Sequence, residues 1–281
     1  MITIIDLGNY NIKYLGESSG VFSSKYHTNF EPNETAFERI EVNGKKYFIG
    51  VGSYSLEYTK ANKECLIPQV LYAIGQANNG NNITTDLGVL LPIEQMPKKE
   101  EIINLLQKRF FRCEINGKTV NIRIEKCLVL PECQTARFSL ENPSEDLLLL
   151  DIGSRTLNFA AYSNNKLNIN GTARLGIINL YEKIMTIENA KGNDYVLSDI
   201  ETQIRRGKIV VPNEVYISFF KELLNAIKTK VSIQKYDVVF LGGGALVLKE
   251  IIKEIEGVEM HNNPVFASVL GALAVAKEIL K

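Results

Sequence analysis

Two stretches about half a chain apart each place an aspartate, then a glycine and small polar residues, after a short apolar run. The first reads ITIIDLGNYNIKYLG and contains Asp6 and Gly8, and the second reads LLLLDIGSRTLNFA and contains Asp151 and Gly153. A tight turn containing glycine exposes backbone N–H groups, which suit an anion such as phosphate. An aspartate cannot bind phosphate directly, because like charges repel, but it can hold hydrated Mg²⁺ or orient a water molecule.

The side chains that follow each aspartate are candidate phosphate ligands. Lys13 is placed to reach a β- or γ-phosphate as a point charge. Each stretch, taken alone, also fits an ordinary β-hairpin with an Asp-containing turn, but the pair is far more specific than either copy. The candidate phosphate and metal ligands are Asp6, Gly8, Asn9, Asn11 and Lys13 in the first copy and Asp151, Gly153, Ser154, Arg155 and Thr156 in the second, with Mg²⁺ expected near Asp6 and Asp151.

A third glycine-rich turn lies near the C-terminus, in YDVVFLGGGALVL, where a buried strand runs into Gly242, Gly243 and Gly244 and then into an apolar helix. Glycines let the backbone approach a ligand closely, and the helix N-terminus favours an anion. The segment is not a Walker loop, because GxxxxGK[ST] is absent. It is not a GxGxxG dinucleotide motif either, because Val247 stands where the third glycine would be.

A carboxylate and an amide follow the predicted strand that ends in VLPE. Glu132 or, failing it, Gln134 is placed to orient a water molecule that attacks a γ-phosphate. The alternative for Glu132 is a charge at a helix N-terminus. In the amphipathic helix expected over residues 176–187, Glu182 and Lys183 are further candidate nucleotide contacts.

The elements that must position these residues are duplicated, which predicts two similar α/β domains facing each other over a nucleotide. A length of 281 residues also favours two domains or one large one. We expect a first lobe over residues 1–135, a second over 136–265, and a C-terminal helix over 266–281 that returns to the first lobe. The expected inserted subdomains are residues 20–125 in the first lobe and a short one at 175–211 in the second.

Within these lobes the pattern predicts specific elements. Two Asn-Gly pairs, at Asn43 and Asn116, each predict a β-hairpin turn. Helical spacing predicts a helix over residues 98–111. A second helix is predicted over residues 197–206, with Ser198 as its N-cap and Glu201 completing a capping box.

Composition excludes several classes of function. A hydrophobic content of 45% and a charged content of 23% are ordinary for a globular protein, and a formal net charge of zero gives no overall attraction to nucleic acid or membrane. No apolar run approaches a membrane span, and Asp6 interrupts the N-terminal apolar stretch, so we expect no signal peptide. The four cysteines form no CxxC pair and only two histidines are present, so we expect free thiols in a reducing cytoplasm and no zinc site.

The order of these motifs resembles that of the actin, hexokinase and heat-shock chaperone superfamily. The order is DxGxxxxK, a Pro-Glu before a connecting helix, a second DxG hairpin, a GGG turn and a terminal helix with a central glycine. More narrowly, the chain resembles bacterial actin-like proteins of plasmid segregation, the ParM and AlfA type. The match spans the whole chain, although residues 20–125 contribute little to it. Arg155 and Asn158 depart from the family pattern, since related hairpins usually have a small residue and an aspartate there.

The resemblance implies an actin-like fold with ATP or ADP, or GTP, and Mg²⁺ in a cleft between two lobes. It implies that Glu132 orients water, that Gly153, Ser154 and Thr156 hold phosphate, and that Gly242–Gly244 flank the nucleoside. It also implies an ATPase, with GTPase activity as an alternative, whose hydrolysis times head-to-tail filament assembly. A separate DNA-binding adaptor of the ParR type, bound to a centromere-like site, would then link the filament to a plasmid.

Two other functions remain open at this point. A small-molecule kinase of the same superfamily, for a vitamin precursor or a sugar, would share the opening DLGNYNIK. Such a kinase needs a base for the substrate hydroxyl, usually an aspartate in a glycine-rich loop, and no convincing one is found. A chaperone-like protein would carry an extra C-terminal domain, which the motifs do not indicate.

Overall fold

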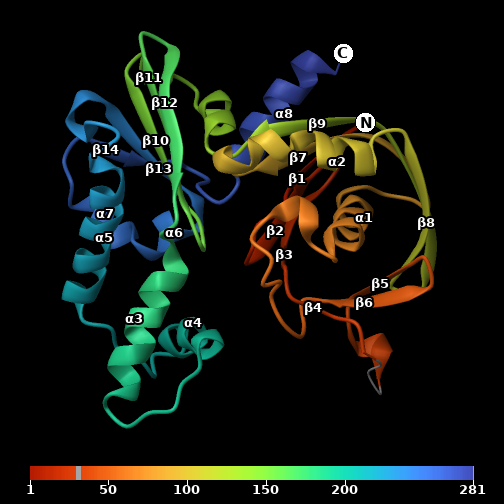
Figure 1. Cartoon of the computed structure of the whole chain (residues 1–281), viewed down its shortest axis with the longest axis horizontal. Helices are drawn as coiled ribbons and strands as arrows, with labels where there is room; N and C mark the ends of the chain where they lie inside the picture. The colour runs from red at the N-terminus through yellow and green to blue at the C-terminus, as the bar shows by residue number, and fades with distance from the viewer. Residues whose placement is uncertain (30–32, 281) are drawn as a thin grey trace. The chain divides into compact units, whose positions relative to one another are not determined.

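The structure is a computed structural model that describes residues 1–29 and 33–280. The chain forms two compact units, Met1–Glu141 with Phe266–Lys281, and Asn142–Val265 (Figure 1). Residues 30–32 of the expected insertion and Lys281 of the expected terminal helix lie outside the described residues.

In its described residues, the first unit combines one long sheet with three α-helices. Its strands are β1 Ile2–Asp6, β2 Asn11–Leu15, β3 Ser19–Ser23, β4 Tyr26–His27, β5 Arg39–Val42, β6 Lys45–Ile49, β7 Asn82–Leu91, β8 Arg109–Ile115 and β9 Lys118–Pro131. Its α-helices are α1 Leu66–Ala77, α2 Lys99–Leu106 and α8 Ala267–Ile279, and its 3-10 helices are Glu34–Ala36, Lys60–Asn62, Ile93–Lys98 and Gln134–Ser139.

The second unit combines a smaller sheet with five α-helices. Its strands are β10 Leu147–Ile152, β11 Leu157–Ser163, β12 Lys166–Ala173, β13 Asp237–Leu241 and β14 Val258–Met260. Its α-helices are α3 Ile177–Asn189, α4 Leu197–Arg205, α5 Asn213–Lys228, α6 Gly242–Val247 and α7 Lys249–Lys253, with a 3-10 helix at Ile233–Lys235.

The central strands of the two sheets have the same order and direction. Among the described residues, the first sheet runs β3-β2-β1-β7-β9-β8-β5-β6-β4 and the second runs β12-β11-β10-β13-β14. In each, an antiparallel hairpin leads into parallel strands, β1 with β7 and β9 in one and β10 with β13 and β14 in the other. The predicted duplication is therefore confirmed. β7 and the first half of β9 come from the stretch 20–125, and both strands belong to the core of the sheet.

Side chains of β1 are buried on both faces of the first sheet. Ile4 packs with Val269 and Ala272 of α8. Ile5 belongs to a second cluster with Val70 of α1 on the opposite face. Figure 1 shows the outer strands of this sheet curving around α1, while α8 lies along the other side of β1 and β7. Burial on both faces holds the carboxyl end of β1, where Asp6 lies, in one place.

The leucine run before Asp151 is a strand, as its apolar pattern predicts. All four leucines of Leu147–Leu150 are at most 1% exposed. Burying a leucine side chain contributes about 1.5–3 kcal/mol to folding. Asp151, near the carboxyl end of β10, therefore follows a run of buried residues, as Asp6 does at the end of β1.

Two predicted turns are confirmed and two helix details are wrong. The Asn43 and Asn116 turns join the paired residues of β5 with β6 and of β8 with β9. The helix predicted over residues 98–111 ends at Leu106, because Lys108 adopts a φ of 56° and the chain then pairs with β9 as β8. Sheet pairing thus overrides the helical spacing.

The capping prediction for α4 is also wrong. The helix begins at Leu197, so Val196 is the N-cap rather than Ser198. The carboxylate of Asp199 accepts a hydrogen bond of 3.2 Å from the Val196 N–H. The acidic side chain that reaches back to the cap is therefore Asp199 and not Glu201.

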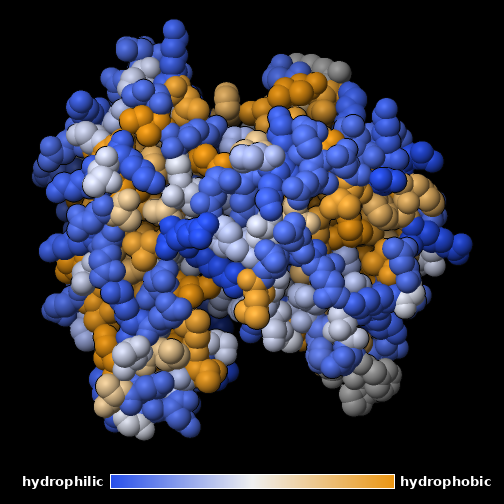
Figure 2. Space-filling view, in the orientation of Figure 1, coloured by the Kyte–Doolittle hydropathy of each residue, from blue (hydrophilic) through white to orange (hydrophobic). Residues whose placement is uncertain are grey.

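The surface mixes polar and apolar groups. Figure 2 shows a mainly hydrophilic face with smaller hydrophobic areas. Exposed apolar side chains include Leu56 (94% exposed) and Val210 (81% exposed). All four cysteines are buried. Within residues 1–29 and 33–280, no helix combines the length and apolar character needed to cross a membrane.

Candidate functional site

The turn of the N-terminal hairpin is closed tightly and tied to neighbouring loops. Asp6 of β1 pairs with Lys13 of β2, and the Lys13 ammonium lies 2.8 Å from the Asp6 carboxylate. A Cβ on Gly8 would lie 2.1 Å from the carbonyl oxygen of Asn11, so this close approach requires glycine. The Asn9 side-chain oxygen accepts a hydrogen bond of 2.7 Å from Lys63. Five predicted residues are thus gathered in one turn.

A lysine that the sequence analysis did not select lies at the centre of this site. Lys60 is 1% exposed, and its ammonium contacts the carboxylate of Asp6 at 3.4 Å and that of Glu132 at closer range. The ammonium also donates to the carbonyl oxygen of Leu90 at 3.3 Å. The backbone N–H of Lys60 donates to the buried amide oxygen of Gln95 at 2.9 Å, which fixes the short 3-10 helix carrying it.

Parallel pairing explains why Glu132 meets Asp6. Asp6 pairs with Leu90 of β7, and Leu90 pairs with Leu130 of β9, so the three strands end at the same edge of the sheet. Glu132 follows directly, and its N–H donates to the carbonyl oxygen of Leu91 at 2.7 Å. Ligand sites of parallel α/β sheets lie at this carboxyl edge. The structure therefore brings Asp6, Lys13 and Glu132 together at this edge.

The two carboxyl groups of this cluster have opposite shifts in pKa. Burial alone would raise the pKa of Asp6, but Lys13 and Lys60 outweigh it and lower that pKa from 3.8 to about 2. Burial raises the pKa of Glu132, with Lys60 opposing the shift and the Asp6 charge adding to it. Neighbouring groups whose environments separate their pKa values are a feature of acid–base sites. Asp6 is suited to be a permanent anion, and Glu132 to accept a proton.

The second hairpin is built in the same register. Asp151 pairs with Asn158 at the same spacing that separates Asp6 from Lys13, and the Gly153 N–H donates to the carbonyl oxygen of Thr156 at 2.8 Å. Asn158 bonds to the Thr172 hydroxyl at 2.7 Å. The second hairpin therefore has an amide where the first has the Lys13 ammonium.

The turn of the second hairpin is locked to the start of α3. The carbonyl oxygens of Gly153 and Ser154 accept hydrogen bonds of 3.1 Å and 2.9 Å from Ile177 and Ile178, the first residues of that helix. A Cβ on Gly176 would lie 2.5 Å from the carbonyl oxygen of Ser154. Gly176 is thus a second structural residue of the site that the motifs did not reveal.

The three glycines after β13 have different roles. A Cβ on Gly242 would lie 2.3 Å from a carboxylate oxygen of Asp151, and one on Gly244 would lie 2.3 Å from the Ile152 side chain. These two glycines are required for packing against β10. A Cβ on Gly243 would meet nothing within 4 Å, so only this glycine leaves backbone open to a ligand.

Three other predicted residues, Glu182, Lys183 and Gln134, lie in helices outside the two hairpin turns. Lys183 of α3 forms a surface ion pair of 2.8 Å with Glu222 of α5, and Glu182 accepts a hydrogen bond of 3.2 Å from Asn179. Neither interaction joins these side chains to the second hairpin turn. Gln134 lies in the 3-10 helix after Glu132, and its N–H donates to the carbonyl oxygen of Glu132 at 2.7 Å.

The residues fit magnesium that arrives with a phosphate ligand rather than a metal held by protein alone. Within the described part of the chain, no group of three His, Cys, Asp or Glu side chains gathers to bind a metal. Mg²⁺ commonly uses one or two carboxylates together with substrate phosphates and water. Each unit has such a carboxylate at the end of a central strand, Asp6 in the first and Asp151 in the second, and a single carboxylate is compatible with that mode.

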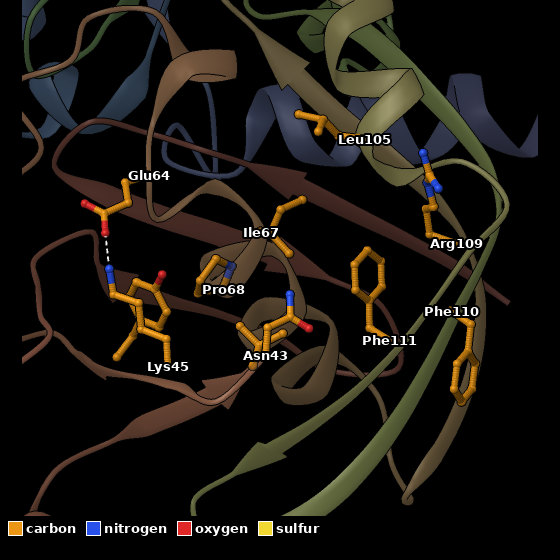
Figure 3. A pocket seen from close by; sticks show the side chains of 11 residues that line it. Asn43, Lys45, Glu64, Ile67, Pro68, Leu105, Arg109, Phe110 and Phe111 are labelled. Carbon is orange, nitrogen blue, oxygen red and sulfur yellow. Dashed lines mark hydrogen bonds and ion pairs between the residues drawn. The ribbon is translucent and has the colours of Figure 1, made fainter.

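A separate pocket of about 630 Å³ lies in the first unit, away from this cluster (Figure 3). Figure 3 shows Ile67, Pro68 and Phe111 among its apolar walls, with the Lys45–Glu64 ion pair at one side. The residues that line it are Val42, Asn43, Lys45, Tyr47, Glu64, Ile67, Pro68, Leu105, Arg109, Phe110 and Phe111. It contains none of the candidate site residues, so it offers no support for them.

Residues 5–134 match the family model described as actin like proteins N terminal domain. This segment includes Asp6, Lys13, Lys60 and Glu132. A comparison with curated protein sequences gives no match.

Solved structures of similar fold cover the whole chain. The non-polymerisable quadruple mutant of pCBH ParM has a TM-score of 0.80 at 19% identity, with 99% of each chain covered. The 15-stranded ParM filament from Clostridium botulinum has a TM-score of 0.75 at 18% identity, with 99% of each chain covered. An archaeal actin homologue in complex with ADP has a TM-score of 0.79 at 15% identity, again with 99% of each chain covered.

The chain has the actin-like fold. Its first unit carries an actin-like N-terminal domain, as the resemblance implied. At such low identity the solved structures show the fold alone.

The lowered pKa of Asp6 predicts a pH-dependent contribution to stability. Because the folded-state pKa lies near 2 and the ordinary value is 3.8, the ionised carboxylate stabilises the fold above pH 3.8, and this contribution is lost as pH falls through about 2. We expect Asp6→Asn to lower the free energy of unfolding by about 2 kcal/mol near neutral pH, and by much less near pH ~2.

Urea unfolding of both proteins across this pH range measures the difference. Asp194→Asn changes an exposed carboxylate and is the matched control. For this variant we expect the difference in unfolding free energy from the unchanged protein to be the same at all pH values. A difference between Asp6→Asn and the unchanged protein that stays constant over the whole range would contradict the assignment.

Proposed function

We propose that this chain binds ATP with Mg²⁺, hydrolyses it and assembles into filaments. The observation that carries the proposal is the buried cluster of Asp6, Lys60 and Glu132 at the carboxyl edge of β1, β7 and β9, with Lys13 beside it. Ammonium groups and a glycine turn recognise phosphate, and a carboxyl group with a raised pKa can take a proton from water. These are the parts that phosphoanhydride hydrolysis requires.

The chain's own residues divide this chemistry among them. Lys13 binds a terminal phosphate as a point charge. The backbone N–H groups of the turn after Asp6 donate hydrogen bonds to the same phosphate. Asp6 and Asp151 are the carboxylates that would hold Mg²⁺, which neutralises phosphate charge when bound. Glu132 orients the attacking water and accepts its proton, while Lys60 fixes the Glu132 carboxylate through their ion pair.

The second unit supplies a parallel set of contacts. The hydroxyls of Ser154 and Thr156 and the N–H groups of their turn are assigned to phosphate, with Arg155 as an added charge. Gly243 is assigned to the nucleoside because its backbone alone among the three glycines of its turn is open. Glu182 and Lys183 are assigned to the outer part of the nucleotide. GTP remains an alternative to ATP.

Filament formation is proposed from the fold and from the described character of similar proteins. One similar structure is a ParM filament from Clostridium botulinum, and another is an archaeal actin homologue with ADP. Head-to-tail contacts that do not close into a ring generate open helical polymers. The descriptions of these structures favour an actin-like filament over the small-molecule kinase.

The cellular role that we propose is plasmid segregation through a separate DNA-binding adaptor of the ParR type. The formal net charge of zero gives the chain no overall positive charge with which to bind DNA directly. An adaptor bound to a centromere-like site would supply the DNA binding. The filament would then move DNA without contacting it.

Glu132→Gln tests the hydrolytic assignment. The amide cannot accept a proton, so we expect phosphate release to slow by about 10²-fold or more while nucleotide affinity is retained. Calorimetric binding and a phosphate-release assay measure the two quantities separately. Glu125→Gln is the control, because Glu125 lies on β9, the strand that directly precedes Glu132, and its side chain is 51% exposed. Turnover of Glu132→Gln at the wild-type rate would remove Glu132 from the mechanism and make Gln134 the next candidate.

Electron microscopy tests filament assembly. We expect pure protein at micromolar concentration to form polar filaments with Mg²⁺ and ATP or a slowly hydrolysed analogue. Glu132→Gln should assemble with ATP and disassemble more slowly, because hydrolysis rather than binding is impaired. Discrete monomers or closed dimers with every nucleotide and salt, together with phosphate transfer to a small hydroxylated metabolite, would instead establish the kinase.

A further inference from the structure

The residue directly after Glu132 has an unusual backbone conformation. Cys133 has φ 66° and ψ −54°, and the Gln134 N–H donates to the carbonyl oxygen of Glu132 at 2.7 Å across it. A hydrogen bond spanning a single residue at these angles defines the classic γ-turn, which is rare and strained for a residue with a Cβ. Such conformations persist only where the surrounding structure over-determines them, and they cluster at functional sites.

Contacts on both sides hold this turn. On one side, the Glu132 N–H is bonded to Leu91 of β7. On the other, Ser268 of α8 accepts a hydrogen bond of 3.2 Å from the Cys133 N–H and another of 2.9 Å, at its carbonyl oxygen, from the Thr135 hydroxyl. Ser268 is 5% exposed, so these bonds are sheltered from water.

Close backbone packing reinforces the same contact. A Cβ on Gly271 would lie 1.7 Å from the carbonyl oxygen of Thr135, so α8 lies directly against the residues that follow the turn. Cys133 itself is 0% exposed. The chain therefore has very little freedom to relax the turn without displacing α8.

We propose that the γ-turn at Cys133, held by Ser268 of α8, sets the position of the Glu132 side chain. Cys133 and Ser268 are positioning residues, which act through Glu132. This inference rests on the proposed hydrolytic role of Glu132. Reversing the chain within one residue fixes the Glu132 backbone between β7 and α8, so its carboxylate is directed to Lys60 rather than left free to move. Misplacement by about 1 Å can cost a catalytic site about 10²-fold in rate.

A pair of substitutions at one position tests the proposal. Cys133→Ala removes the thiol but keeps the Cβ, whereas Cys133→Gly removes both and makes the positive φ available without strain. Alanine is usually more stable than glycine in a fold, because glycine gains more freedom on unfolding. Here we expect Cys133→Gly to melt at a temperature at least as high as Cys133→Ala.

We expect the glycine variant, although it is at least as stable as the alanine variant, to have the lower kcat. We expect Cys133→Ala to keep a near-normal kcat, and Cys133→Gly to lose about tenfold or more in kcat at unchanged KM, because the loosened turn no longer fixes Glu132. Ser268→Ala should lower kcat in the same way, and Ser268→Thr, which keeps a hydroxyl, should restore it. A merely structural role would change stability without this division between kcat and KM.

Hydrogen exchange of the Gln134 amide gives a readout that does not depend on activity. We expect this amide to exchange at least tenfold faster in Cys133→Gly and Ser268→Ala than in Cys133→Ala. Equal exchange in all three, or a normal kcat in Cys133→Gly despite faster exchange, would overturn the proposal. If the unchanged protein hydrolyses no ATP, the proposed function fails, and the exchange rates still decide whether Ser268 holds the turn.

Discussion

The site depends on one buried interaction, in which the Lys60 ammonium lies between the carboxylates of Asp6 and Glu132. Taking an ammonium out of water costs several kcal/mol unless carboxylates and hydrogen bonds compensate it. Here two carboxylates and the carbonyl oxygen of Leu90 do so. Removing the lysine would leave two buried like charges facing each other, so Lys60 is required to hold the ends of β1 and β9 as a single acidic site. Because β7 lies between β1 and β9 in the sheet, the Asp6 and Glu132 carboxylates are held at a separation that one lysine side chain bridges.

The two hairpins differ in the side chain that faces the aspartate. In the first unit, Asp6 faces Lys13 across the hairpin and Lys60 from outside it, and the pKa values of Asp6 and Glu132 shift in opposite directions. In the second unit, the position paired with Asp151 is Asn158, a neutral side chain bonded to Thr172. We infer that the first unit carries the acid–base chemistry and that the second contributes mainly backbone N–H groups, hydroxyls and close-packed glycines. The same turn geometry therefore occurs in both units with different partners for the aspartate.

Sequence patterns revealed the parts of the site that follow from local structure. The apolar runs before Asp6 and Asp151 and the glycines after them predicted both hairpins, because strand burial and tight turns depend on nearby residues. Lys60 was missed because it lies in a short 3-10 helix outside both hairpin motifs, and only tertiary packing brings it to the edge of the sheet. The residue type of Cys133 does not indicate its strained φ. Residues 109–111 have helical spacing in the sequence, and they are a strand because they pair with residues 122–124 across the Asn116 hairpin. The required glycine at Gly176 is explained only by its contact with Ser154.

The most direct test of the central claim is a crystal structure of the chain with Mg²⁺ and a slowly hydrolysed ATP analogue. The account predicts that the terminal phosphate lies within hydrogen-bond distance of Lys13 and of the N–H groups after Asp6. It also predicts a water molecule between that phosphate and the Glu132 carboxylate, at hydrogen-bond distance from the latter. A nucleotide bound elsewhere in the chain, or a bound nucleotide whose terminal phosphate is remote from Lys13 and Glu132, would contradict it.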